Sequence, residues 1–228
     1  MATQPTTLTP GKGERTATRV REAALELFSR LGFERTTMGD IAVAAGVSQP
    51  ALHYHFQDKA QLWRAAMLQL RAVIAEEEQL MEASTGAGPL DQLRTALRLF
   101  LQISWKHPAL GRIVALEGMA GGERLDWLHA HLLGPRNQRL VDLARAAIAA
   151  GELKPFPPEQ LIITLQAAGA GVINLSPLMK TSFGIDPSTP TARAAHEAMM
   201  LDAFLGGLLA QPQSPARRQT APASGEAP

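Results

Sequence analysis

Apolar residues recur at helical spacing along almost the whole chain, and this pattern restricts the fold more than any other feature. In the first segment Val20, Ala24, Leu27 and Leu31 repeat every three or four residues, and Gly32 follows them as a stop. Further runs of the same period cover 59–83, 89–106, 123–150, 157–180 and 191–210. No alternating run of β-branched or aromatic residues lies between hairpin turns. We therefore predict an all-α protein of about nine or ten helices.

Composition narrows the classes of function. The 228 residues can bury a sizeable core and hold a small domain beside a larger one. Cysteine is absent, which excludes disulfides, thiolate zinc sites and a cysteine nucleophile, and fits a reducing cytosol. The formal net charge is +1, so any surface for nucleic acid must be a local patch. The sequence lacks an apolar leader and a long uncharged apolar run, so we expect a cytoplasmic protein without a membrane segment.

The two ends differ from the rest of the chain. Residues 1–13 are rich in Thr, Pro and Gly, and residues 211–228 carry few apolar side chains. Such segments bury too little apolar surface to offset the entropy of ordering. We therefore predict a disordered arm over 1–13 and a disordered tail over 211–228.

The stretch from Thr37 to Phe56 has the pattern of two short helices joined by a tight turn. Thr37 and Asp40 form a capping-box pair at the start of the first helix. Gly46 then permits the left-handed conformation that turns the chain, and Ser48 caps the second helix. Small and apolar residues at the spacing that lets two helices approach closely complete the pattern of a helix-turn-helix.

This stretch belongs to a longer motif, LFSRLGFERTTMGDIAVAAGVSQPALHYHFQDKAQL, which covers residues 27–62. The motif resembles the signature of the TetR (tetracycline repressor) family of transcriptional regulators. The resemblance implies a three-helix DNA-binding domain over 14–60, followed by a helical effector-binding and dimerisation domain over 61–210. It also implies a homodimer that binds a palindromic operator in double-stranded DNA and is released by a small organic effector. Where the family usually has a tyrosine that contacts the DNA backbone, this chain has His53, and the aromatic residue is displaced to Tyr54.

The second helix of a helix-turn-helix places its N-terminal residues against base edges in the major groove. We predict that Gln49 reads adenine, because its amide can form two hydrogen bonds with the base edge. Pro50 and Ala51 offer apolar surface to a thymine methyl group. His53 and His55, with Tyr54 between them, supply donors and flat surfaces beside the duplex.

Contacts to the DNA backbone need donors around this helix. We predict such donors at Thr36, Thr37, Ser48, Tyr54 and Lys59. The N-terminal segment is also basic, because it carries Lys12, Arg15, Arg19 and Arg21 against Glu14.

Small residues are frequent in the two last helical runs. Glycine within a helix costs roughly 1 kcal/mol relative to alanine, so the glycines of 157–175 require a packing reason. We predict that this run and 191–210 form a four-helix dimer interface, as the resemblance also implies. The candidate interface residues are Gly169, Ile173, Met199, Phe204 and Leu208. The alternative is an ordinary core within one chain.

An effector site is expected where polar groups lie among apolar helices near Pro108 and Gly118. The candidates are Trp105, His107, Arg112 and Glu117. The alternative is that these are ordinary surface and core residues. Nothing in the sequence identifies the effector.

Other classes of function find less support in the sequence. His53 and His55 are two positions apart, so on a helix they point about 200° apart and do not form a metal pair. Asp126 and His129 have carboxylate–histidine spacing, but a second such motif is missing. We expect no cofactor and no enzyme activity, because no acid–base constellation is visible. An all-α enzyme and a helical adaptor or RNA-binding protein are the alternatives, and repression and activation both stay open.

Overall fold

The computed structural model describes residues 11–81 and 88–209, which form ten continuous helical segments and no strand. The helices are α1 (Lys12–Arg35), α2 (Met38–Ala45), α3 (Gln49–His55), α4 (Lys59–Met81), α5 (Pro89–Lys106), α6 (Pro108–Ala120), α7 (Glu123–Leu128), α8 (Gly134–Ala149), α9 (Pro158–Asn174), α10 (Ser176–Phe183), α11 (Pro190–Met199) and α12 (Gly206–Leu208). Two π-helical turns, η2 (His129–Leu133) and η3 (Met200–Leu205), join α7 to α8 and α11 to α12. The predicted all-α class is confirmed.

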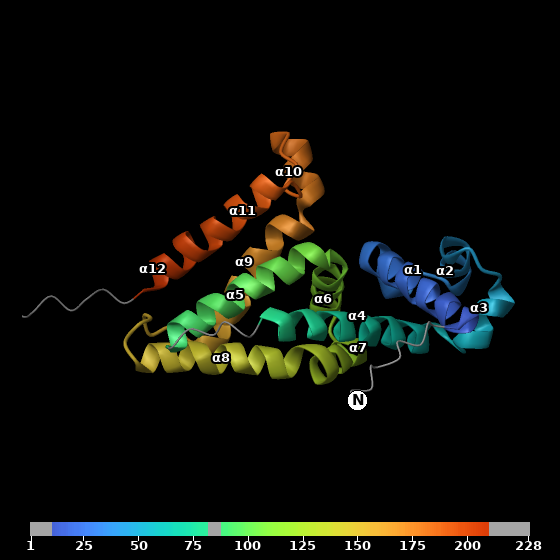
Figure 1. The fold of residues 1–228 in the computed structure, drawn as a ribbon, viewed down its shortest axis with the longest axis horizontal. Helices are drawn as coiled ribbons and strands as arrows, with labels where there is room; N and C mark the ends of the chain where they lie inside the picture. Colours follow the sequence, from blue (N-terminus) through green and yellow to red (C-terminus); the bar gives the residue numbers. More distant parts are fainter. Residues whose placement is uncertain (1–10, 82–87, 210–228) are drawn as a thin grey trace, which may run out of the picture.

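Helices α1, α2 and α3 form a small bundle at one end of the molecule (Figure 1). Val20, Phe28, Ile41 and Leu52 are fully buried at its centre. Leu31 differs from the prediction, since 41% of it is exposed. The buried stripe of α1 follows every fourth residue and so drifts around the helix, which leaves Leu31 outside.

Helix α4 links this bundle to the rest of the protein. Trp63 and Met67 in its first half are buried in the same apolar cluster as α1, and Ile113 of α6 and Leu128 of α7 belong to that cluster too. The second half of α4 packs through Ile74 against α5. The core of the small bundle is therefore continuous with the larger helical part.

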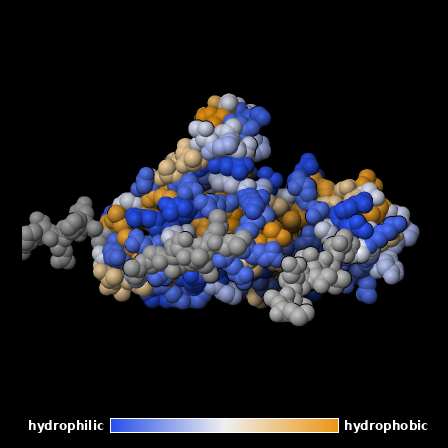
Figure 2. Space-filling view, in the orientation of Figure 1, coloured by the Kyte–Doolittle hydropathy of each residue, from blue (hydrophilic) through white to orange (hydrophobic). Residues whose placement is uncertain are grey.

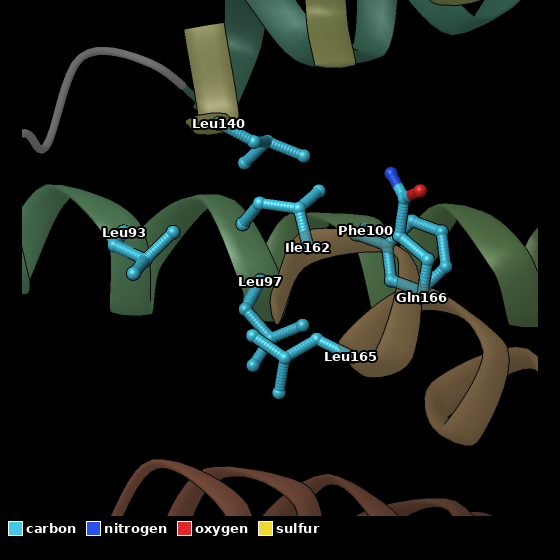
Figure 3. A pocket seen from close by; sticks show the side chains of 7 residues that line it. All are labelled: Leu93, Leu97, Phe100, Leu140, Ile162, Leu165 and Gln166. Carbon is cyan, nitrogen blue, oxygen red and sulfur yellow. The ribbon is translucent and has the colours of Figure 1, made fainter. Parts of the chain in front are cut away.

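The centre of the larger part lies between α5, α8 and α9, and Figure 3 shows its side chains converging. Leu93, Leu97, Leu140, Ile162 and Leu165 surround a space of only about 10 Å³. A buried water needs at least roughly this volume. The apolar centre of the larger part is therefore filled by side chains.

Helix α10 projects from the body of the molecule (Figure 1), and Figure 2 shows a hydrophobic patch at this tip. Leu178, Phe183 and Ile185 are each about half exposed or more there. Within the described ranges no single helix is long and apolar enough to cross a membrane, although α9 and α10, bent by 60° at their junction, meet that test as a pair.

Candidate functional site

The turn between α2 and α3 is built from local hydrogen bonds. Thr37 Oγ1 accepts the Asp40 N–H at 3.1 Å, and the Asp40 carboxylate accepts the Thr37 N–H at 3.2 Å, so the predicted capping box is confirmed. Gly46 ends α2 with φ 62°, in the left-handed region where a Cβ is unfavourable. Ser48 Oγ accepts the Ala51 N–H at 3.3 Å and caps α3. These contacts fix the angle between the two helices.

Helix α3 turns one face to the core and the other to solvent. Leu52 and Phe56 are buried, whereas Gln49, Pro50 and Tyr54 are exposed. We call Gln49, Pro50, Ala51, His53 and Tyr54 the reading face. Tyr54 is 86% exposed, so its ring and hydroxyl are open to a partner.

Gln49 lies at the N-terminal end of the reading face, against the start of α2. A Cβ added at Gly39 would come within 2.7 Å of the Gln49 Nε2 atom. The amide therefore lies beside the backbone of α2, on a residue that is exposed as a whole. This position suits a side chain that has to reach a base edge in one orientation.

The residues predicted to bind the DNA backbone fall into two groups. Thr37 and Ser48 are exposed at the starts of α2 and α3, where free N–H groups favour anions. Thr36 is fully buried, and its hydroxyl donates to the Gly32 carbonyl at 2.8 Å. The prediction of a phosphate contact by the Thr36 side chain is therefore wrong. Its hydroxyl instead binds a carbonyl that the break in α1 at Gly32 leaves free.

Lys59 has partners that the sequence did not indicate. Its ammonium donates to the carbonyls of Phe33 at 2.8 Å and Thr36 at 3.0 Å, and lies 4.3 Å from the centre of the Phe33 ring. A cation is favourable at a helix C-terminus, here the end of α1. In this structure Lys59 therefore joins α4 to α1, and a contact with phosphate stays a prediction.

His55 points away from the reading face. It is half-buried, its ring centre lies 5.2 Å from that of Tyr54, and a Cβ added at Gly13 would lie 3.8 Å from its ring. It therefore faces the start of α1. His53, on the other side of α3, is exposed.

The basic N-terminal segment is largely a helix rather than an arm, because α1 begins at Lys12. Arg19 donates to the carbonyls of Ala45 and Gly46 and stabilises the end of α2. Arg21 is paired with Glu14. Lys12 and Arg15 remain exposed and can face DNA, while residues 1–10 of the predicted arm, and the tail over 211–228, lie outside the described residues.

The four candidate effector residues do not form one site. Trp105 and Arg112 line one cavity of about 390 Å³ between the α5–α6 junction, the end of α9, α10 and the start of α11. His107 binds Glu77 of α4 at 3.1 Å, and the Lys106 ammonium, together with His107, holds the pKa of Glu77 below its ordinary range. Glu117 is buried and bound by Arg124. His107 and Glu117 therefore contact Glu77 and Arg124 and do not line this cavity, so their assignment to one site with Trp105 and Arg112 is wrong.

Two further cavities were not predicted. One of about 350 Å³ lies between α4, α5 and α8 and contains Arg71, Glu78 and Arg136. Another of about 340 Å³ lies between Phe33, Trp63 and Trp127 at the junction of the small bundle with α6 and α7. Both volumes are typical of small-molecule sites. The sequence carried no signal for either, because each brings together residues far apart in the chain.

Some of the predicted dimer residues are buried within the chain, and others are not. Gly169 is buried inside the chain, where a Cβ would come within 2.8 Å of Leu101 and 3.1 Å of Phe100. Ile173 is buried as well, and Leu208 is half-buried against the apolar cluster of the larger part. The small residue at 169 therefore allows α9 to approach α5, and the prediction of a dimer contact is wrong for Gly169 and Ile173. Met199 is 50% exposed, and the side chain of Phe204 lies outside the described residues.

Known proteins share both parts of this architecture. Residues 20–66 match the family described as bacterial regulatory proteins, tetR family, and residues 89–204 match the tetracyclin repressor-like C-terminal domain. The HTH-type transcriptional regulator RutR of Escherichia coli strain K12 is 30% identical over 192 residues, which cover 80% of this chain and 87% of that protein.

Solved structures are similar over most of their length. A bacterial regulatory protein in the tetR family from Rhodococcus aligns with a TM-score of 0.67 at 18% identity, covering 89% of this chain and all of that one. HlyIIR, a hemolysin II transcriptional regulator, aligns with a TM-score of 0.63 at 17% identity, covering 88% and 100%. At these identities the structures support the fold, and the sequence matches support the family. The chain belongs to the TetR family of helix-turn-helix transcriptional regulators.

Proposed function

We propose that the chain binds a palindromic operator as a homodimer, represses transcription there, and leaves the DNA when a small organic effector binds. The role is regulatory rather than catalytic, and its place is the cytoplasm. The observation that carries the proposal is the reading face, where Gln49 and Tyr54 stay exposed on a helix that Leu52 and Phe56 anchor. A helix held in this way can enter the major groove as a rigid body.

The contacts to DNA follow from the positions of the exposed groups. Gln49 reads a base edge, and Pro50 and Ala51 face a thymine methyl group. His53, Tyr54, Thr37 and Ser48 bind the phosphates on either side. Lys12 and Arg15, exposed at the start of α1, extend this contact along the backbone.

The homodimer contact is proposed on the outer faces of α9 and α11. Ile163 is 60% exposed and Met199 is 50% exposed, with the small residues Ala167, Ala195 and Ala198 exposed beside them. Apolar residues flanked by small ones let helices of two subunits approach closely. This surface keeps the helices of the sequence-based prediction and replaces the residues that proved to be internal.

The division into 14–60 and 61–210 stays part of the proposal, with α4 as the link. Its first turn is bound to the end of α1 through Lys59, and its second half packs against α5. An effector that favours another position of α4 would change the distance between the two reading faces of a dimer. Half-sites lie about one DNA turn or slightly more apart, so a small change in this distance weakens binding.

Selection from a random DNA pool tests the proposed function. The full-length protein is incubated with random duplexes, and the bound DNA is recovered and sequenced over several rounds. We expect enrichment of one inverted repeat, which the protein then binds in excess competitor DNA with two subunits per site. Recovery of no common sequence, or of a site bound by one subunit, would contradict the proposal.

A further inference from the structure

The cavity between α4, α5 and α8 has an unusual distribution of charge. Its lining includes Arg71, Arg136 and Glu78, and the further arginine of the wall, Arg139, has an interaction of its own. The rest of the wall is polar through Gln79, Gln92 and Thr95, and apolar through Ala75, Ala96, Leu99, Pro135 and Leu140. The site therefore combines positive charge with apolar surface in about 350 Å³.

Two arginines share the one carboxylate. Glu78 lies 3.3 Å from Arg136 and 3.7 Å from Arg71. The side chains of Glu78 and Arg136 are 22% and 25% exposed, so water screens the charges of these two residues only in part. Burial lowers the pKa of Arg136, and the nearby charge of Arg71 adds to this effect while Glu78 opposes it. The single Glu78 carboxylate therefore balances only one of the two positive charges of Arg71 and Arg136.

The Arg71 guanidinium is only weakly paired, and its side chain is 41% exposed. Its Nη1 atom is fully buried and has no hydrogen-bond partner among the described residues. The 3.7 Å to Glu78 is too long for a hydrogen bond. A buried donor without a partner is costly, and the donors of a guanidinium match a carboxylate or a similar oxyanion.

We infer that the effector is an organic anion, a carboxylate whose charged group binds Arg71 and Arg136 while its apolar body lies on Leu99 and Leu140. This inference rests on the proposed function and adds the chemical class of the effector. The carboxylate binds the Arg71 guanidinium, whose side chain is 41% exposed. Arg136 binds the carboxylate as well, and the Phe100 ring, 5.8 Å away, lies beside this guanidinium.

The same contacts connect the site to the DNA-binding end. Arg71 and Glu78 both belong to α4, and the ion pair of Glu78 with Arg136 ties α4 to α8. A carboxylate ligand competes with Glu78 for Arg136 and loosens this tie. Helix α4 then moves at its second half, and Lys59 in its first turn carries the change to α1.

Carboxylates paired with amides of the same carbon skeleton test the inference. Benzoate with benzamide, phenylacetate with phenylacetamide, and hexanoate with hexanamide are titrated into the DNA-free full chain by calorimetry, at constant ionic strength. We expect at least one acid to bind and its amide not to bind. Amides that bind as well as their acids, or a set of acids that all fail to bind, would overturn the inference.

Variants of the site separate binding from folding. Arg136→Gln is expected to weaken the acid about tenfold or more, because a charge-assisted contact is lost. Arg145→Gln, an exposed and ion-paired arginine of the same helix, is the control and keeps the affinity. Glu78→Gln removes the competing carboxylate, so it should strengthen binding, a result that misfolding cannot produce. Unchanged affinity in both site variants would overturn the inference.

Failure here is distinguishable from failure of the proposed function. Operator binding without ligand is measured separately, on DNA recovered from the random pool. A protein that binds its operator but no carboxylate refutes only the ligand class. A protein that binds carboxylates but selects no DNA refutes the proposed function.

Discussion

The Nε–H of Arg124 lies 2.9 and 3.0 Å from the two carboxylate oxygens of Glu117, which is 4% exposed. The same guanidinium binds Glu34 at 3.1 Å and lies 4.3 Å from the centre of the Phe33 ring. Glu117 and Arg124 belong to the larger part, and Phe33 and Glu34 to the end of α1. Arg124 therefore connects the two parts of the molecule.

Arg124→Met should lower the free energy of unfolding by roughly 1–3 kcal/mol, because it leaves the buried Glu117 carboxylate without its partner. Methionine keeps apolar contact with Phe33, so the charge is the main change. Thermal and urea unfolding measure the effect. Arg145→Met, whose partners Asp142 and Glu159 are exposed, is the control and should change little. Equal stability of the two variants would show that the Glu117 pair contributes no more than a surface pair.

Lys59→Met should destabilise the protein by roughly 1–3 kcal/mol, because carbonyls at the end of α1 lose a cationic donor. Urea unfolding gives the value, with the exposed Lys12→Met as the control. The salt dependence of DNA binding should change less in Lys59→Met than in Lys12→Met. Unchanged stability with a flatter salt dependence would assign Lys59 to a phosphate instead.

His196 should make the stability depend on pH. It is 5% exposed, neither ring nitrogen has a hydrogen-bond partner among the described residues, and burial lowers its pKa from the ordinary 6.5. Below about that pH the unfolded chain binds a proton that the folded chain does not, so the free energy of unfolding falls. Melting temperatures between about pH 8 and pH 5.5 should fall more in the wild type than in His196→Phe, which keeps a ring against Trp105. If the melting temperatures of the two proteins fell equally over this pH range, His196 would not be the cause of the pH dependence.

Ile163→Glu should separate the proposed dimer, because it places an unpaired charge within an apolar contact. Sedimentation should find monomers, and operator binding should weaken steeply because one half-site alone is bound weakly. Met119→Glu, at a 79% exposed methionine of α6, is the control and should stay dimeric. A dimeric Ile163→Glu protein would place the interface on another surface.

The sequence predicted well what depends on neighbours in the chain. The capping box of Thr37 and Asp40, the turn at Gly46 and the cap at Ser48 each need residues only a few positions apart. The helical periods likewise gave the all-α class, because they record which face of each helix is buried.

Features that depend on residues far apart in the chain could not be predicted from the sequence. Nothing near Thr36 shows that its hydroxyl is buried, and nothing near Gly169 shows that α5 rather than a second subunit lies against it. Arg71 and Arg136 are 65 positions apart and meet only because α4 and α8 line one cavity. A helical pattern identifies a buried face but not the helix that covers it.

Gln49→Ala tests the central claim most directly. On the operator recovered from the random pool, the variant should lose about 1–3 kcal/mol of binding free energy for each half-site, while its affinity for scrambled DNA stays unchanged. Fluorescence anisotropy at one salt concentration measures both affinities, with Gln138→Ala, an exposed glutamine of α8, as the control. Equal losses on operator and scrambled DNA, or no loss on either, would contradict base reading by α3.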